Sequence, residues 1–274
     1  MPRRLINTAG LALAAVLSAG CASSTSSTSS TAGAPAAGFF RPSPASAEPA
    51  VSSAITVFAA ASLTTAFTEL GKQFETTHPG TAVTFSFGAS STLAQQIIAA
   101  APADVFAAAS PSTMKQVTDA GDATDAMTFA TNVAEIAVAP RSAGKVTGLA
   151  DLAKPGVKVA LCQPQVPCGA LAQTVLAKAK VLITPVTQGL DVKSTLAYVT
   201  SGEADAAIVY VTDVQAAGAA VTGIPIPAES NASTAYPIAT VKGSKNPVLA
   251  AAFTDFVLSA AGRGVLRGAG FSTP

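Results

Sequence analysis

The stretch Ile55-Thr56-Val57-Phe58-Ala59-Ala60-Ala61-Ser62-Leu63-Thr64 decides the fold, because a strand leads there directly into a helix. Residues 55–58 are apolar or β-branched, which is typical of a short buried strand. Ser62 is placed to open the helix. The apolar residues that follow keep the spacing of one helical face, at Leu63, Ala66, Phe67, Leu70 and Phe74. A strand followed by a helix is the repeating unit of a parallel α/β sheet.

The same alternation continues to the end of the chain. Further strands are predicted at 83–87, 104–109, 133–138, 157–161, 206–211 and 236–241, and helices are predicted to begin near Ser90, Pro111, Gly169, Asp191 and Pro247. Two successive runs of this kind within 54–274 indicate an α/β protein with two lobes.

Composition and charge exclude several classes of protein. The chain has 274 residues, of which 49% are hydrophobic, so it can bury a core and is not disordered overall. Its net charge of +1, without a basic run, argues against nucleic-acid binding. A single histidine, His78, argues against a histidine metal site, and no phosphate loop or hydrolase motif occurs in the sequence. Enzyme function therefore has little support.

The amino terminus has the pattern of an export signal. Residues 1–20 combine two early arginines with the largely apolar stretch Leu5–Ala19, which is too short to span a membrane. The stretch ends in Leu17-Ser18-Ala19-Gly20-Cys21, which resembles a bacterial lipobox and predicts lipidation of Cys21. Ordinary cleavage that leaves Cys21 unmodified is the alternative. Residues 21–53 are rich in Ser, Thr, Ala and Pro, so we expect a flexible tether.

Small hydroxyl residues stand where strands lead into helices, at Ser62, Ser90 and Ser91. The start of a helix presents free backbone N–H groups and the positive end of the helix dipole, which together suit an anion. Serine is also a preferred capping residue, so each of these serines has a purely structural explanation as well.

Several segments resemble, in order, the periplasmic molybdate-binding proteins of ABC importers. The resemblance covers essentially all of 54–274 and rests on 55–64, on Phe87-Gly88-Ala89-Ser90-Ser91-Thr92-Leu93-Ala94-Gln95-Gln96-Ile97, on Ala101-Pro102-Ala103-Asp104-Val105-Phe106, on Val166-Pro167-Cys168-Gly169, on Ile208-Val209-Tyr210-Val211-Thr212-Asp213, on Ala235-Tyr236-Pro237-Ile238 and on Gly270-Phe271.

The resemblance implies a two-lobed type II periplasmic-binding-protein fold. Each lobe would be a mostly parallel sheet flanked by helices, with the ligand in the cleft between the lobes. Residues 54–137 and 240–274 would form the first lobe and 138–239 the second, with crossings near Glu135–Ala139 and Ile238–Val241.

The resemblance also implies a set of oxyanion-binding residues. Ser62 and Ser90 would each contribute a hydroxyl and a backbone N–H, Cys168 and Val192 a backbone N–H, and Tyr210 its hydroxyl. The metal would be reached only through its oxygens, without direct protein ligands or a cofactor. Each helix N-terminus carries roughly +0.5 charge, so converging helices can offset a dianion without Lys or Arg. Tyr210 could instead be a core residue at a strand end.

These implications lead to a functional hypothesis. We expect an extracytoplasmic lipoprotein, a monomer anchored to the cell membrane, that captures molybdate or tungstate for the permease and ATPase of an importer. Another oxyanion such as sulfate is the nearest alternative. A thiol-redox protein using Cys162 and Cys168 is more distant, since C-x5-C is not the usual C-x-x-C spacing. A ligand-sensing regulatory domain would need a DNA-binding helix pair or a membrane span, and neither accompanies the predicted lobes.

Cys162 and Cys168 flank a five-residue loop that contains Pro164 and Pro167. An exported chain meets oxidising conditions, in which disulfides persist. We therefore predict a bond between these two cysteines, which would hold the turn that presents the Cys168 N–H. Two buried free thiols are the alternative.

Overall fold

The computed structural model describes residues 53–274. The predicted signal peptide at 1–20, the lipidation site at Cys21 and nearly all of the tether at 21–53 lie outside the described residues.

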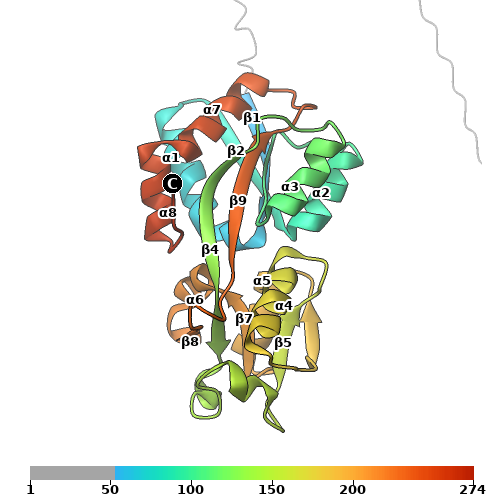
Figure 1. Ribbon diagram of the computed structural model, residues 1–274. Coiled ribbons are helices and arrows are strands. Elements are labelled where there is room, and N and C mark those ends of the chain that lie inside the picture. Colours follow the sequence, from blue (N-terminus) through green and yellow to red (C-terminus); the bar gives the residue numbers. More distant parts are fainter. Residues whose placement is uncertain (1–52) are drawn as a thin grey trace, which may run out of the picture. The chain divides into compact units, whose positions relative to one another are not determined.

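Strands and helices alternate through the described part of the chain, as the sequence predicts (Figure 1). The strands are β1 (Ser53–Ala60), β2 (Thr81–Gly88), β3 (Val105–Ala107), β4 (Met127–Val138), β5 (Val159–Cys162), β6 (Thr187–Gly189), β7 (Ala206–Tyr210), β8 (Thr222–Pro225) and β9 (Ser233–Thr240). The α-helices are α1 (Thr64–Thr77), α2 (Ser90–Ile98), α3 (Pro111–Asp119), α4 (Pro167–Ala179), α5 (Val192–Thr200), α6 (Val211–Ala217), α7 (Pro247–Leu258) and α8 (Ala260–Gly268). Short 3₁₀ helices are η1 (Ala61–Leu63), η2 (Pro140–Ser142), η3 (Leu149–Ala153) and η4 (Gly218–Ala220).

The strands form two α/β lobes that share β4. In lobe 1 the strand order is β2-β1-β3-β9-β4, with β1 parallel to β2 and β3 and with β9 antiparallel to its neighbours. In lobe 2 the order is β4-β7-β5-β6, with β5 parallel to β6 and β7, and β8 pairs with the other edge of β4. Helices α1, α7 and α8 cover one face of the lobe 1 sheet, and α2 and α3 cover the other (Figure 1).

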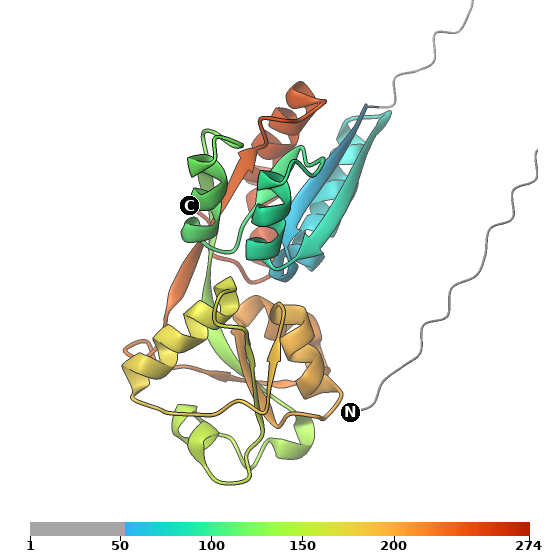
Figure 2. The same ribbon diagram turned by 90° about the vertical axis from the view of Figure 1, so that its right-hand side faces the viewer.

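Strands β4 and β9 run between the lobes (Figure 2). β4 pairs with β9 from Met127 to Val133 and with β7 from Ala134 onward. β9 pairs with β4 from its first residue, Ser233. The chain therefore leaves lobe 1 and returns to it earlier than the expected boundaries at 137/138 and 239/240, which fall within strands. A strand that continues unbroken from one sheet into the next gives no break in the apolar pattern at the crossing.

The two lobes have cores of different character. Lobe 1 is packed around phenylalanines such as Phe67, which is fully buried and meets Phe253 edge to face at 6.2 Å between ring centres. Lobe 2 is packed mainly with Ala, Val, Ile and Leu. Ala61 and Ala89 of lobe 1 are buried against the lobe 2 core, so the lobes are in contact across the space between them.

Within residues 53–274, no single helix has both the length and the apolar character needed to cross a membrane. The consecutive helices α7 and α8 meet those criteria only when taken together, and they are bent by 60° at their junction.

Candidate functional site

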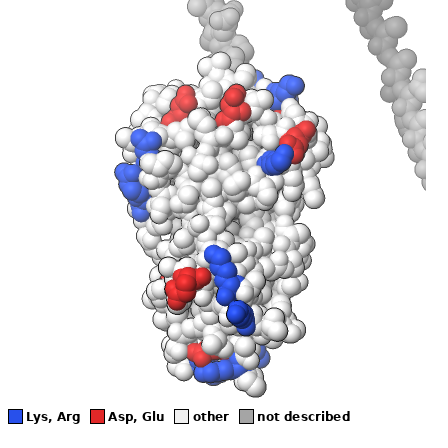
Figure 3. Space-filling model, in the orientation of Figure 1, with Lys and Arg blue, Asp and Glu red and all other residues white. Residues whose placement is uncertain are grey.

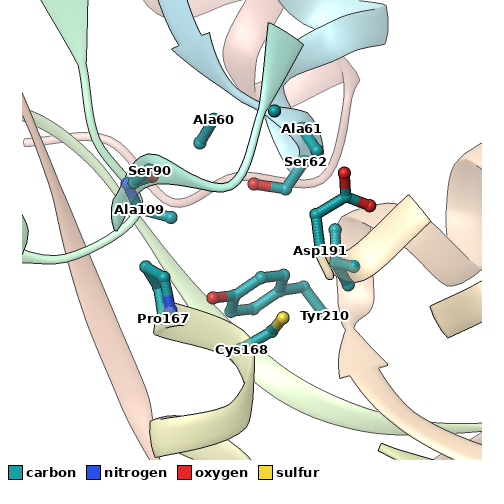
Figure 4. Close-up of a pocket in the computed structure, with 11 residues that line it drawn as sticks. Ala60, Ala61, Ser62, Ser90, Ala109, Pro167, Cys168, Asp191 and Tyr210 are labelled. Atoms are coloured by element: carbon teal, nitrogen blue, oxygen red, sulfur yellow. The ribbon is translucent and has the colours of Figure 1, made fainter. Parts of the chain in front are cut away.

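A small pocket lies between the lobes and brings together all five of the predicted anion-binding residues (Figure 4). The space between its lining residues is about 220 Å³, part of which is open to solvent. Lobe 1 contributes the ends of β1 and β2, η1, the start of α2 and the second residue after β3, and lobe 2 contributes the starts of α4 and α5 and the end of β7. The lining residues are Ala60, Ala61, Ser62, Gly88, Ser90, Ala109, Pro167, Cys168, Asp191, Val192 and Tyr210. Ligands of open α/β sheets commonly bind at such carboxyl ends of strands.

Ser90 faces the pocket and does not cap its helix. The N-cap of α2 is Ala89, and Ser90 is the first residue of the helix. Its Oγ accepts a hydrogen bond from the backbone N–H of Ala109 at 3.0 Å. Because an N–H can only donate, the hydroxyl hydrogen of Ser90 is left for another acceptor. Ser90 therefore does not have the capping role that its residue type also allowed, and its side chain is available to a ligand.

Ser62 differs from the prediction in a similar way. It lies within η1, α1 begins two residues later, and the N-cap of α1 is Leu63. Its Oγ is 2.9 Å from the hydroxyl of Tyr236, and either oxygen could be the donor by distance alone. Ser91 does not line the pocket. Ser62 and Ser90, which line the pocket, each have a hydroxyl that is hydrogen-bonded to a residue distant in the sequence rather than to their own helix.

The start of α4 offers free backbone donors. Val166 is the N-cap and Pro167 the first residue, and proline has no N–H. Because the first four positions of a helix have no intrahelical acceptor, the N–H groups of Cys168 and Gly169 are left for other partners. Cys162 and Cys168 form a disulfide with an S–S distance of 2.00 Å, which joins the end of β5 to this turn.

The start of α5 is held by a capping box. The Asp191 carboxylate accepts from the N–H of Ser194 at 2.8 Å, and the Ser194 hydroxyl is 3.0 Å from the N–H of Asp191. These bonds confirm that Asp191 caps the helix. They leave the N–H of Val192, the first residue of α5, without an intrahelical partner.

Tyr210 ends β7 with its side chain almost completely buried. Its hydroxyl lines the pocket and has no hydrogen-bond partner among residues 53–274. Burial raises the pKa of Tyr210 well above its ordinary value, and the nearby Tyr236 and Asp213 raise it further. The hydroxyl therefore keeps its proton and remains a donor. An unpaired buried O–H is costly, and an acceptor in the pocket would remove that cost.

No Lys or Arg side chain lines the pocket, and charged side chains are thinly spread over the face shown in Figure 3. The fully buried Asp213, close behind Tyr210 in the sequence, pairs with Lys193 at 2.9 Å. Burial raises the pKa of Asp213, and the charge of Lys193 opposes that shift. Within 53–274, no three His, Cys, Asp or Glu side chains are grouped closely enough to hold a bare metal ion. The pocket is suited to an anion that accepts hydrogen bonds.

Sequence reasoning did not identify two polar residues that adjoin the site. Tyr236 on β9 contacts Ser62, and Asn132 on β4 contacts Tyr236. Tyr236 belongs to Ala235-Tyr236-Pro237-Ile238, one of the segments that resemble the molybdate-binding proteins, but nothing in the local pattern assigns it to the pocket. Asn132 could have been noticed in the sequence, because a buried amide inside an apolar strand needs hydrogen-bond partners.

Gly169 is required where α4 begins. A Cβ at this position would lie 1.9 Å from the backbone oxygen of Gln163, so Gly169→Ala must displace the loop that carries the disulfide. We expect its free energy of unfolding in urea to fall by about 1–3 kcal/mol. Gly264→Ala is the matched control, because no atom lies within 4 Å of its added Cβ in α8. That variant should gain about 0.5–1 kcal/mol. Equal stability of Gly169→Ala and the parent would contradict this role of Gly169.

Comparisons with known proteins identify the family of the chain. The model of the bacterial extracellular solute-binding protein family matches residues 55–272. The molybdate-binding protein ModA of Mycobacterium tuberculosis is 38% identical over 221 residues, which cover 80% of this chain and 85% of that protein. YvgL of Bacillus subtilis, a proposed substrate-binding lipoprotein of an ABC transporter, is 32% identical over 161 residues, 57% of this chain and 62% of that protein. The periplasmic molybdate-binding protein of Azotobacter vinelandii has the same fold, with a TM-score of 0.73 at 23% identity over 80% of this chain and 99% of that one.

Proposed function

The chain belongs to the bacterial extracellular solute-binding protein family, among the relatives of the molybdate-binding protein ModA, and we propose that it captures molybdate or tungstate for an ABC importer. The family binds solutes for transport, so the protein is not an enzyme. The two bonded cysteines then have a structural role at the pocket rather than a role in thiol-redox chemistry.

The observation that carries the proposal is the buried hydroxyl of Tyr210, which has no partner among residues 53–274 and lines a pocket surrounded by other donors. The hydroxyl of Ser90 accepts from Ala109 and so can donate into the pocket. The N–H groups of Cys168 and Val192 lie at helix starts. The one carboxylate in the lining, that of Asp191, accepts from its own helix. A tetrahedral anion without protons satisfies all of these donors at once.

The charge of such an anion is offset without a salt bridge. Helices α2, α4 and α5 begin at the pocket, and each N-terminus carries roughly +0.5 charge, so together they supply about +1.5. Hydrogen bonds from neutral donors to a charged oxygen are also stronger than bonds between neutral groups. A dianion held in this way is stabilised, and it can be released to a transporter without separation of a buried ion pair.

A panel of oxyanions tests the proposal. Molybdate and tungstate should bind tightly, sulfate much more weakly and phosphate negligibly, as measured by titration calorimetry. Phosphate at neutral pH carries a proton that needs an acceptor, whereas the pocket offers donors. Sulfate has the same charge but shorter bonds, so its hydrogen bonds in a pocket sized for a larger anion are stretched. Sulfate or phosphate bound as tightly as molybdate would show that the protein serves another anion.

Serine variants test the position of the site. Ser62→Ala and Ser90→Ala should each weaken molybdate binding by about 1–3 kcal/mol, because each removes a hydrogen bond to a charged ligand. Ser91→Ala is the matched control, since Ser91 is the neighbour of Ser90 in α2 and lies outside the pocket lining. Its affinity should equal that of the parent. If all three variants bind molybdate like the parent, the anion binds elsewhere.

We further propose that Cys21 is lipidated and anchors the protein to the outer face of the cell membrane, where it serves as a monomer beside its permease and ATPase. The lipobox-like residues 17–21 support the anchor, and so does the likeness to YvgL. In cells that carry Cys21→Ala, the protein should move from the membrane fraction to the soluble extracytoplasmic fraction. Retention in the membrane fraction would contradict the lipid anchor.

A further inference from the structure

A line of buried polar side chains runs behind the pocket from the crossing strand to Ser62. The amide nitrogen of Asn132 is 3.5 Å from the hydroxyl of Tyr236, which is 2.9 Å from the Oγ of Ser62. Tyr236 is fully buried, and the exposed fractions of Asn132 and Ser62 are 3% and 6%. These side chains are therefore partners of one another rather than of bulk solvent.

The direction of the hydrogen bonds along this line is fixed at Asn132. The backbone N–H of Val133 donates to Oδ1 of Asn132 at 3.0 Å, which identifies the oxygen end of the amide. The NH₂ end then faces Tyr236, and an amide NH₂ group can only donate. The hydroxyl of Tyr236 accepts from Asn132 and still has a hydrogen to donate. Among residues 53–274, the Oγ of Ser62 is the one acceptor within hydrogen-bond distance of this buried hydroxyl, so the hydrogen goes to Ser62. Burial raises the pKa of Tyr236, so this hydrogen is retained.

The direction decides what Ser62 offers to a ligand. When its Oγ accepts from Tyr236, the hydrogen of the Ser62 hydroxyl is free to point into the pocket. In the reverse direction that hydrogen would be used on Tyr236, and only lone pairs would face an anion. Ser90 reaches the same state through the backbone N–H of Ala109. For Ser62, the hydroxyl of Tyr236 takes the part that the backbone N–H of Ala109 has for Ser90.

We propose that Tyr236, oriented by Asn132, is a positioning residue of the anion site that keeps the Ser62 hydroxyl a donor toward the ligand. The proposal rests on the proposed function. Asn132 is the last-but-one residue of β4 before that strand joins the lobe 2 sheet, and its amide also donates to Oγ1 of Thr212 in lobe 2 at 2.8 Å. The same amide thus donates to Tyr236 of lobe 1 and to Thr212 of lobe 2. The orientation of the Ser62 hydroxyl is therefore linked to the contact between the two lobes.

A double-mutant cycle tests the role of Tyr236, with molybdate affinity measured by calorimetry. Tyr236→Phe removes one oxygen, and we expect it to weaken binding about five- to tenfold in the parent. In a Ser62→Ala background the same change should cost less than about twofold, because no hydroxyl remains to be oriented. Asn132→Leu should show the same dependence on Ser62. Melting of each ligand-free variant confirms that it is folded.

Phe271→Leu is the packing control, because Phe271 meets the ring of Tyr236 edge to face at 5.3 Å and leaves its hydroxyl in place. It should change affinity less than about twofold in either background. Tyr236→Phe with the same cost in both backgrounds, or with no cost in the parent, would overturn the positioning role. A parent protein that binds no molybdate would contradict the proposed function itself, so the two failures are distinguishable.

Discussion

The pairing of β4 with strands of both lobes is the constraint on which the pocket depends. Opposite residues of paired strands project from the same face, and Ala130 faces Tyr236 on β9 whereas Ala134 faces Tyr210 on β7. Asn132 lies between the two alanines on that face, because side chains two apart in a strand point the same way. One strand therefore places both tyrosines and the amide between them. The small alanines leave room for the two aromatic rings.

The composition of the chain reflects the chemistry of the site. An anion held by neutral donors needs backbone close to the ligand, and small side chains allow that approach. Ala60, Ala61 and Ala109 line the pocket, and Gly169 brings the start of α4 within reach of the 163–168 loop. The buried Asp213 is paired with Lys193, so its charge is partly balanced behind the donors. A low content of charged residues is thus compatible with tight recognition of a charged ligand.

The sequence predicted the strand-helix units, the helix start at Asp191 and the disulfide loop, because each depends on local chemistry. The residues that converge on the pocket were predicted from the resemblance to the molybdate-binding proteins. The sequence did not predict β6 and β8, which are three and four residues long and contain Gly or Pro, so they lack a strand pattern. It left Ser90 with both a capping and a ligand-binding explanation, because a preferred cap and a ligand-facing serine look alike in sequence. The partnership of Ser62 with Tyr236 spans 174 positions and depends on the tertiary fold.

The division of donors between the lobes connects this geometry to capture and release. Ser62 and Ser90 belong to lobe 1, whereas Cys168, Val192 and Tyr210 belong to lobe 2. An anion in contact with one lobe alone meets only part of the donor set and part of the helix charge. Under the proposed function, its affinity is therefore greater for the arrangement in which the lobes meet, and such a difference in affinity is what allows a ligand to shift a conformational equilibrium. The burial of Ala61 and Ala89 against the lobe 2 core adds an apolar contribution to the same arrangement.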